Sequence, residues 1–287
     1  MDWRTEEAWI CANPGWDSCI DQEGIRQLAK KAMQLPSSKP AFISKHLNVW
    51  VNADTVWIPA EKMQASIDPT LKESDFAGSP CYVGLDLASR LDLCAAVRLY
   101  TRTVADKLHF YAFGNYWLPT ETSDASQYSS TFRAWEDAGY MVLTPGSATD
   151  LDYVEASLIE TSKTAKVKEV AYDQFMATQL IQHLEAEDMT CVQVPMTVRT
   201  MSPAMKMLEE AVAQGRFHFN DPCLAWCISN TVCHRDQKDN IFPNKDDKNS
   251  QRKIDGLVAL LDAFSRLAVA PPDDEGSVYE KRGVLVL

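Results

Sequence analysis

Residues Tyr82–Leu99, with the sequence YVGLDLASRLDLCAAVRL, decide how the rest of this chain is interpreted. The apolar run that opens this stretch contains Asp86, and an unpaired carboxylate inside a sheet costs several kcal/mol in lost hydration. A second apolar run, Leu93–Leu99, follows Asp92. Two apolar runs joined by a short polar segment predict a β-hairpin. The hairpin therefore carries one acid in its first strand and another near its turn, and both need an explanation.

The bulk composition is that of an ordinary globular protein. The chain has 287 residues, of which 46% are hydrophobic, and a net charge of −12. This charge argues against broad electrostatic capture of nucleic acid, although clustered metal-binding acids would lower the net charge of a nuclease in the same way. We find no apolar run as long as a membrane span and no signal-peptide core at the acidic N-terminus. Eight cysteines without paired spacing predict free thiols in a reducing cytoplasm.

Hydrophobic patterning predicts an α/β fold with a mixed sheet flanked by helices. Three consecutive antiparallel strands come first, and strands then alternate with helices, which adds parallel strands to the same sheet. The predicted strands cover residues 81–87, 93–101, 107–116, 167–172 and 190–194. The sequence contains no GxxxxGK[ST] motif, so a phosphate-binding loop of that kind is not expected.

The chain divides into three parts on its patterning. Residues 1–80 hold too few periodic elements to bury a core of their own, and we interpret them as an arm or linker packed on the main domain. Residues 81–270 form that main domain, and residues 271–287 form a C-terminal tail.

Three segments of the main domain lead to specific expectations. Thr120–Tyr128 is expected to be a polar loop, and Thr231–Ser250 a polar and charged stretch. Ser202-Pro203 is expected to open a helix, because serine is a favoured cap and proline a favoured first residue.

Three acids from distant segments form a candidate constellation. Asp86 and Asp173 each lie at or near the end of an apolar strand, in VGLDLA and VAYDQF, and sites in open α/β sheets form at the carboxyl ends of strands. Asp255 opens an apolar helix directly before Gly256, whose missing side chain allows a backbone or a ligand to approach closely. Carboxylates from separate segments suit Mg²⁺ or Mn²⁺, and two such ions promote phosphodiester cleavage.

Each acid also has a structural interpretation. Asp86 can bond to turn amides, Asp92 can stabilise the hairpin turn, and Asp173 or Asp255 can cap a helix. Asp262 lies on nearly the same helix face as Asp255 but two turns deeper, so we expect a structural role for it.

The ordered motifs of the chain resemble the C-terminal nuclease half of the large terminase subunit of tailed bacteriophages. The resemblance spans nearly the whole sequence, and it is the set in this order that is specific. Its motifs are ANP, LNVWV and VWIP, then VGLDLASRLDLCA, VAYDQFMATQLIQHL and MSPAMKMLEEAVAQGRFHF, and finally LAWCISN and KIDGLVALLDAFSR.

The resemblance implies a ribonuclease H-like fold and an endonuclease that cuts concatemeric phage DNA during packaging in the host cytoplasm. It places catalytic, metal-binding acids at Asp86, Asp173 and Asp255, an accessory acid at Asp92, and Mg²⁺ or Mn²⁺ as cofactor. It also implies double-stranded DNA, the portal protein and the small terminase subunit as partners, and no membrane association. The family's large subunit carries a packaging ATPase that this chain lacks, so ATP-driven translocation is not expected of it.

A basic cluster precedes Asp255 and is the candidate DNA-binding surface. Its members are Lys245, Lys248, Arg252 and Lys253. Interleaved acids weaken this patch, and a solvated loop explains it equally well. Lys245 resembles a family lysine, which implies a role in stabilising phosphate or transition-state charge.

We therefore predict a metal-dependent DNA endonuclease. The alternative from another class is a non-catalytic terminase remnant or docking module that binds portal or terminase partners. A resolvase or transposase with the same fold ranks third.

Overall fold

The computed structural model describes most of the chain. The described residues are 2–35, 38–47, 55–87, 92–173, 177–236, 238–245 and 251–269. The predicted hairpin turn at residues 88–91 and the predicted tail at 271–287 lie outside them. Within them, no helix combines the length and the apolar character needed to cross a membrane.

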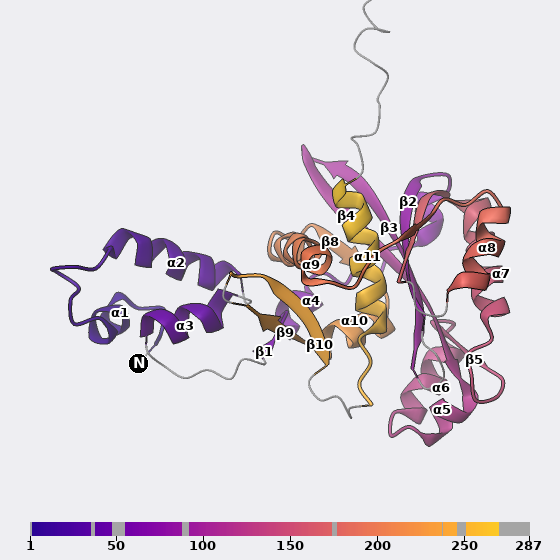
Figure 1. Ribbon diagram of the computed structural model, residues 1–287, viewed down its shortest axis with the longest axis horizontal. Coiled ribbons are helices and arrows are strands. Elements are labelled where there is room, and N and C mark those ends of the chain that lie inside the picture. The colour runs from indigo at the N-terminus through magenta and orange to yellow at the C-terminus, as the bar shows by residue number, and fades with distance from the viewer. Residues whose placement is uncertain are drawn as a thin grey trace, which may run out of the picture.

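A mixed sheet forms the centre of the molecule (Figure 1), and seven of its strands are described. They are β2 (Pro80–Asp86), β3 (Cys94–Val104), β4 (Lys107–Pro119), β5 (Met141–Thr144), β6 (Lys166–Tyr172), β7 (Cys191–Gln193) and β8 (Phe217–Phe219). The order is β5-β4-β3-β2-β6-β7, and β8 pairs with β4. The strands β2, β3 and β4 are antiparallel, whereas β6 runs parallel to β2 and β7 parallel to β6. The prediction of three antiparallel strands followed by parallel strands is confirmed.

Helices cover both faces of this sheet because the strands are apolar on both sides. The helices α7 (Leu151–Thr164) and α8 (Thr178–Ala186) pack on one face, against inward side chains such as Val83 and Leu85. The other face, with Val97 and Leu99, packs against α9 (Val198–Ala213), α10 (Pro222–Ser229) and α11 (Asp255–Val269). Two short helices, α5 (Thr120–Ala125) and α6 (Ser129–Asp137), lie beside β5 at one end of the sheet (Figure 1).

Helix α11 lies directly against β2 because Gly84 has no side chain. A Cβ atom at Gly84 would come within 1.8 Å of the carbonyl oxygen of Ala259. Gly256 is close to the aromatic ring of Tyr116, since a Cβ atom at Gly256 would lie 2.8 Å from Cε1 of that ring. The expected close approach at Gly256 is therefore made by protein side chains of the core.

The N-terminal segment contains a small core, which corrects our expectation. Helices α1 (Glu6–Ala12), α2 (Gln22–Gln34) and α3 (Lys39–Leu47) bury a cluster that includes Trp9, Ile25 and Phe42. Figure 1 shows these helices at one end of the molecule, away from the sheet. Aromatic side chains such as Trp9 bury a large area each, so a few of them are enough to make a small core.

Residues 55–80 pack into the main body. They contain β1 (Thr55–Val56), α4 (Ala60–Gln64) and a 3-10 helix at Glu73–Phe76. Trp57 is fully buried in the core beneath α9 and α11, and Phe76 is buried on the opposite face of the sheet.

A second, three-stranded sheet corrects the prediction for Thr231–Ser250. Strands β9 (Thr231–Arg235) and β10 (Ile241–Lys245) form an antiparallel hairpin, and β1 pairs with β9. Each of these two strands is only five residues long, and the polar turn between them made the whole stretch look polar in the sequence.

Two further element predictions were wrong. Helix α9 begins at Val198, so Ser202 and Pro203 lie inside it, and the Ser202 hydroxyl instead accepts a hydrogen bond from the backbone N–H of Ile241 at 3.1 Å. Thr120–Tyr128 is not a loop throughout, since α5 occupies its first six residues. In both places a local cap or loop signal was outweighed by packing against the sheet.

Candidate metal centre

Asp86 and Asp173 leave the sheet side by side. Asp86 is the last residue of β2, Asp173 directly follows β6, and the residues before them, Leu85 and Tyr172, are partners in the parallel ladder. Side chains alternate along a strand, so Asp86 points to the same face as Gly84, the face that α11 covers. The two acids therefore emerge from neighbouring strand ends, at the carboxyl edge of the sheet.

Asp255 approaches the same edge from α11. It is the first residue of that helix, its side chain is only 6% exposed, and one of its carboxylate oxygens, Oδ2, accepts a hydrogen bond from the N–H of Ile254 at 3.1 Å. Burial raises its pKa to about 6, with a further contribution from the negative charge of Asp92 that Lys245 and Lys253 oppose. Asp255 is thus a buried acid that holds its proton more tightly than a free carboxyl group.

Asp86 shares this electrostatic environment. Burial raises its pKa well above the ordinary value, and the charges of Asp255, Asp262 and Asp92 raise it further. The Lys245 ammonium group lowers it only in part. Carboxylates that disfavour each other's ionisation in this way are stabilised by a cation.

Two lysines supply positive charge to the accessory acid. Oδ2 of Asp92 accepts a hydrogen bond from Nζ of Lys245 at 2.8 Å. Oδ1 of the same carboxylate lies 2.6 Å from Nζ of Lys253. Burial opposes the ionisation of Asp92, but Lys253 and Lys245 outweigh it, so the pKa of Asp92 is lowered. Burial likewise opposes the charge on Lys245, but Asp255, Asp92 and Asp86 raise its pKa overall.

Asn230 supports the backbone next to the site, a role that the sequence analysis did not single out. It follows α10, and its side-chain amide donates to the carbonyl of Lys253 at 3.1 Å. This bond fixes the backbone that leads from Lys253 into Asp255. Its signal in the sequence was its place in the LAWCISN motif.

The predicted basic cluster is divided by the structure. Lys245 and Lys253 extend into the acidic site, Arg252 is exposed, and Lys248 lies outside the described residues. A DNA-binding role for the four residues stays a prediction.

The donor chemistry fits a hard divalent cation. The converging groups are carboxylates, and oxygen ligands of this kind suit Mg²⁺ or Mn²⁺ better than softer metals. Within the described part of the chain, no three His, Cys, Asp or Glu side chains stand close enough to form a complete ligand set. The raised pKa values of Asp86 and Asp255 are the observation that favours a cation here.

Comparison with known proteins agrees with this architecture. Residues 1–270 match the family model described as terminase large subunit, endonuclease domain. The chain belongs to this family. The match includes the N-terminal helices as well as the sheet and the acids.

Two relatives place the terminase domain within longer proteins. The chain is 30% identical to protein YmfN of Escherichia coli strain K12, over 95% of this chain and 62% of YmfN. It is 26% identical to the terminase large subunit of Enterobacteria phage HK97, over 90% of this chain and 51% of the relative. The chain thus spans about half to three-fifths of the length of these relatives.

A solved structure shows the same fold. The crystal structure of the HK97 large terminase superposes with a TM-score of 0.61 at 24% sequence identity, covering 92% of this chain and 55% of that protein. The terminase domain described here has the ribonuclease H-like fold of its family, as the resemblance implied.

Proposed function

We propose that this terminase domain is a metal-dependent DNA endonuclease that uses two divalent ions. The observation that carries the proposal is that Asp86 and Asp173 stand at the ends of neighbouring parallel strands, with Asp255 of α11 near enough to raise the pKa of Asp86. Family membership supports the reaction class, since the family model is that of an endonuclease domain.

Asp86, Asp173 and Asp255 would hold Mg²⁺ or Mn²⁺, with Asp92 as an accessory acid. Such ions supply an activated water and stabilise the leaving oxygen of a phosphodiester. Lys245 and Lys253 lie beside these acids, where their ammonium groups can bind a phosphate of the substrate. With Lys248 and Arg252 they would form the DNA-facing surface.

The proposed substrate is concatemeric viral double-stranded DNA, cut during genome packaging in the host cytoplasm. The portal protein and the small terminase subunit are the proposed partners. This assignment rests on the family and on the terminase large subunit of phage HK97 as a relative.

A plasmid-nicking assay with Mn²⁺ tests the proposal. The wild-type chain should nick and linearise supercoiled plasmid, and Asp86→Ala and Asp255→Ala should each lower the rate at least about a hundredfold, because each removes a carboxylate from the ions that stabilise the transition state. Glu209→Gln, a buried acid on α9, is the matched control and should cleave like the wild type. Undiminished cleavage by both aspartate variants would refute the site.

A second candidate is a non-catalytic docking module for portal or terminase partners. It is favoured by the incomplete ligand set among the described residues and by the lysines that already neutralise Asp92. Wild-type protein that binds no Mn²⁺ and cuts no plasmid would support this candidate over the endonuclease.

A further inference from the structure

Asp262 is a buried acid that the proposed mechanism does not use. It lies on α11 seven residues after Asp255, which places it on nearly the same helix face about 10 Å further along the axis. Its side chain is 1% exposed. One of its carboxylate oxygens, Oδ2, is buried without a hydrogen-bond partner in the part of the chain that the structure describes.

Helix α11 packs against β6 in the region of Asp262. One turn beyond it on α11, Arg266 pairs with Glu169 of β6, with 2.6 Å between Nε and Oε2. Glu169 lies on the face of β6 that α11 covers, and Asp173 directly follows the end of that strand. Burial raises the pKa of Asp262 well above its ordinary value, and the charge of Asp173 raises it further. Asp262 in turn raises the pKa of Asp86.

A purely structural acid looks different in this protein. Asp221 is also buried, at 5% exposure, but its carboxylate accepts hydrogen bonds from the Tyr116 hydroxyl at 2.7 Å and from the N–H groups of Cys223 and Leu224 at 2.9 and 3.0 Å. Burial still raises the pKa of Asp221, but these donors offset part of the cost of burying the carboxylate. At Asp262 an apolar residue would stabilise the fold better than a carboxyl group with an unpartnered oxygen.

We propose that Asp262 is a positioning residue of the cation site, which strengthens the binding of a divalent metal through Asp173 and Asp86. The inference rests on the proposed function. A divalent cation bound by Asp173 and Asp86 favours the ionised form of Asp262, and the charge of Asp262 then attracts the cation strongly because the protein interior screens charge poorly. Groups behind the ligands of a metal commonly change its affinity by 10- to 100-fold when they are replaced.

Isothermal titration of the full chain with Mn²⁺ tests this role, together with the melting temperature of the metal-free protein. Asp262→Asn should bind Mn²⁺ about tenfold more weakly than the wild type and should melt at a higher temperature, because the asparagine does not have to take up a proton on folding. Asp262→Ala should weaken binding to a similar extent. Glu209→Gln makes the same acid-to-amide change in a side chain that is 3% exposed on α9, and should leave Mn²⁺ affinity within twofold.

The opposing results separate this inference from the proposed function. If both Asp262 variants bind Mn²⁺ within twofold of the wild type and Asp255→Asn does not bind it, the proposed role of Asp262 is overturned and the proposed function is not. Lower melting temperatures together with weaker binding, or a failure of both variants to fold, would show a structural role and also overturn it. Absence of Mn²⁺ binding by the wild type would instead contradict the proposed function.

Discussion

At the scale of single residues, the candidate site keeps its acids in a state that costs stability. Asp255 and Asp86 both have raised pKa values, mainly because they are buried, and other carboxylates add to the effect. Groups tuned this way concentrate at functional sites, because the fold maintains them at the expense of its own stability. This loss of stability can be measured by replacing one of the acids with its neutral amide.

Asp255→Asn should stabilise the metal-free protein at neutral pH. The pKa of Asp255 is about 6 in the folded chain and about 4 when unfolded, so the folded state binds the proton more tightly. The fold therefore loses stability as the pH rises from about 4 to 6, and the loss persists above that range. The neutral asparagine does not have this loss, so the free energy of unfolding of the variant should be higher by roughly 1–3 kcal/mol at pH 7.5.

Urea unfolding in EDTA at pH 4 and at pH 7.5 measures this difference. The gain in the free energy of unfolding should be present at pH 7.5 and small at pH 4. A variant that is less stable than the wild type at pH 7.5 would contradict the assigned charge state.

The sequence could indicate the acids but not their counter-charges. Asp86 was visible because it lies inside an apolar run, where a charge is unexpected, and Asp173 and Asp255 because each lies at the boundary of such a run. The pairing of Asp92 with Lys245 joins residues 153 positions apart, and no local pattern predicts such a contact. Asp262 was interpreted as structural because its depth in the helix was visible, whereas its missing donors were not.

At the scale of elements, the packing of α11 on β2 sets the geometry of the site. Gly84 allows the helix backbone to touch the strand, and this contact aligns Asp255 with Asp86. The surface of α11 is buried along most of its length, which fixes its position.

Gly84→Ala should destabilise the fold by about 3 kcal/mol or more, because its Cβ would lie 1.8 Å from a backbone oxygen that cannot move without shifting α11. Gly256→Ala is the matched comparison and should cost about 1 kcal/mol, since the nearest atom, at 2.8 Å, belongs to the Tyr116 side chain. Urea unfolding of both variants measures the difference. A cost below about 1 kcal/mol at Gly84 would mean that α11 is not fixed against β2.

The hydrophobic pattern of the sequence predicted deeply buried helices and strands well. It predicted less well the ends of helices and the short strands outside the main sheet. The three antiparallel strands and α11 were predicted because their apolar runs are long. The start of α9 and the β9–β10 hairpin were missed, because tertiary contacts such as the bond from Ile241 to Ser202 decide them.

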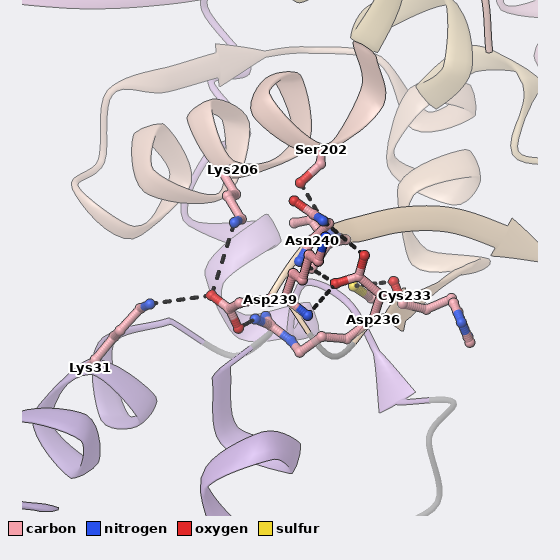
Figure 2. Close-up of polar contacts among 11 residues, drawn as sticks. Lys31, Ser202, Lys206, Cys233, Asp236, Asp239 and Asn240 are labelled. Atoms are coloured by element: carbon pink, nitrogen blue, oxygen red, sulfur yellow. Dashed lines mark hydrogen bonds and ion pairs between the residues drawn. The ribbon is translucent and has the colours of Figure 1, made fainter. Parts of the chain in front are cut away.

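At the scale of the whole molecule, one aspartate links three parts of the fold. Asp239 lies in the turn of the β9–β10 hairpin at φ +66° and pairs with Arg235 of β9, with Lys31 of α2 at 3.4 Å and with Lys206 of α9 at 3.9 Å. Figure 2 shows Lys31 and Lys206 reaching the Asp239 carboxylate from two different helices. The other end of the same hairpin is Lys245, which contacts Asp92 in the site.

Asp239→Asn should loosen the attachment of α2 and the hairpin without unfolding the protein. Exposed ion pairs contribute little each, so the free energy of unfolding should fall by less than about 1 kcal/mol. Hydrogen exchange should become several-fold faster in peptides from α2 and the hairpin. Asp188→Asn is the matched control, because Asp188 is an exposed turn residue at φ +60°. Equal exchange in both variants would contradict a link through Asp239.

Anomalous scattering from a crystal of the full chain soaked in Mn²⁺ tests the central claim most directly. We predict anomalous density at the sheet edge where β2 and β6 end, in contact with the carboxylates of Asp86, Asp173 and Asp255. Ordered Mn²⁺ bound elsewhere, with these three carboxylates free of metal, would contradict it.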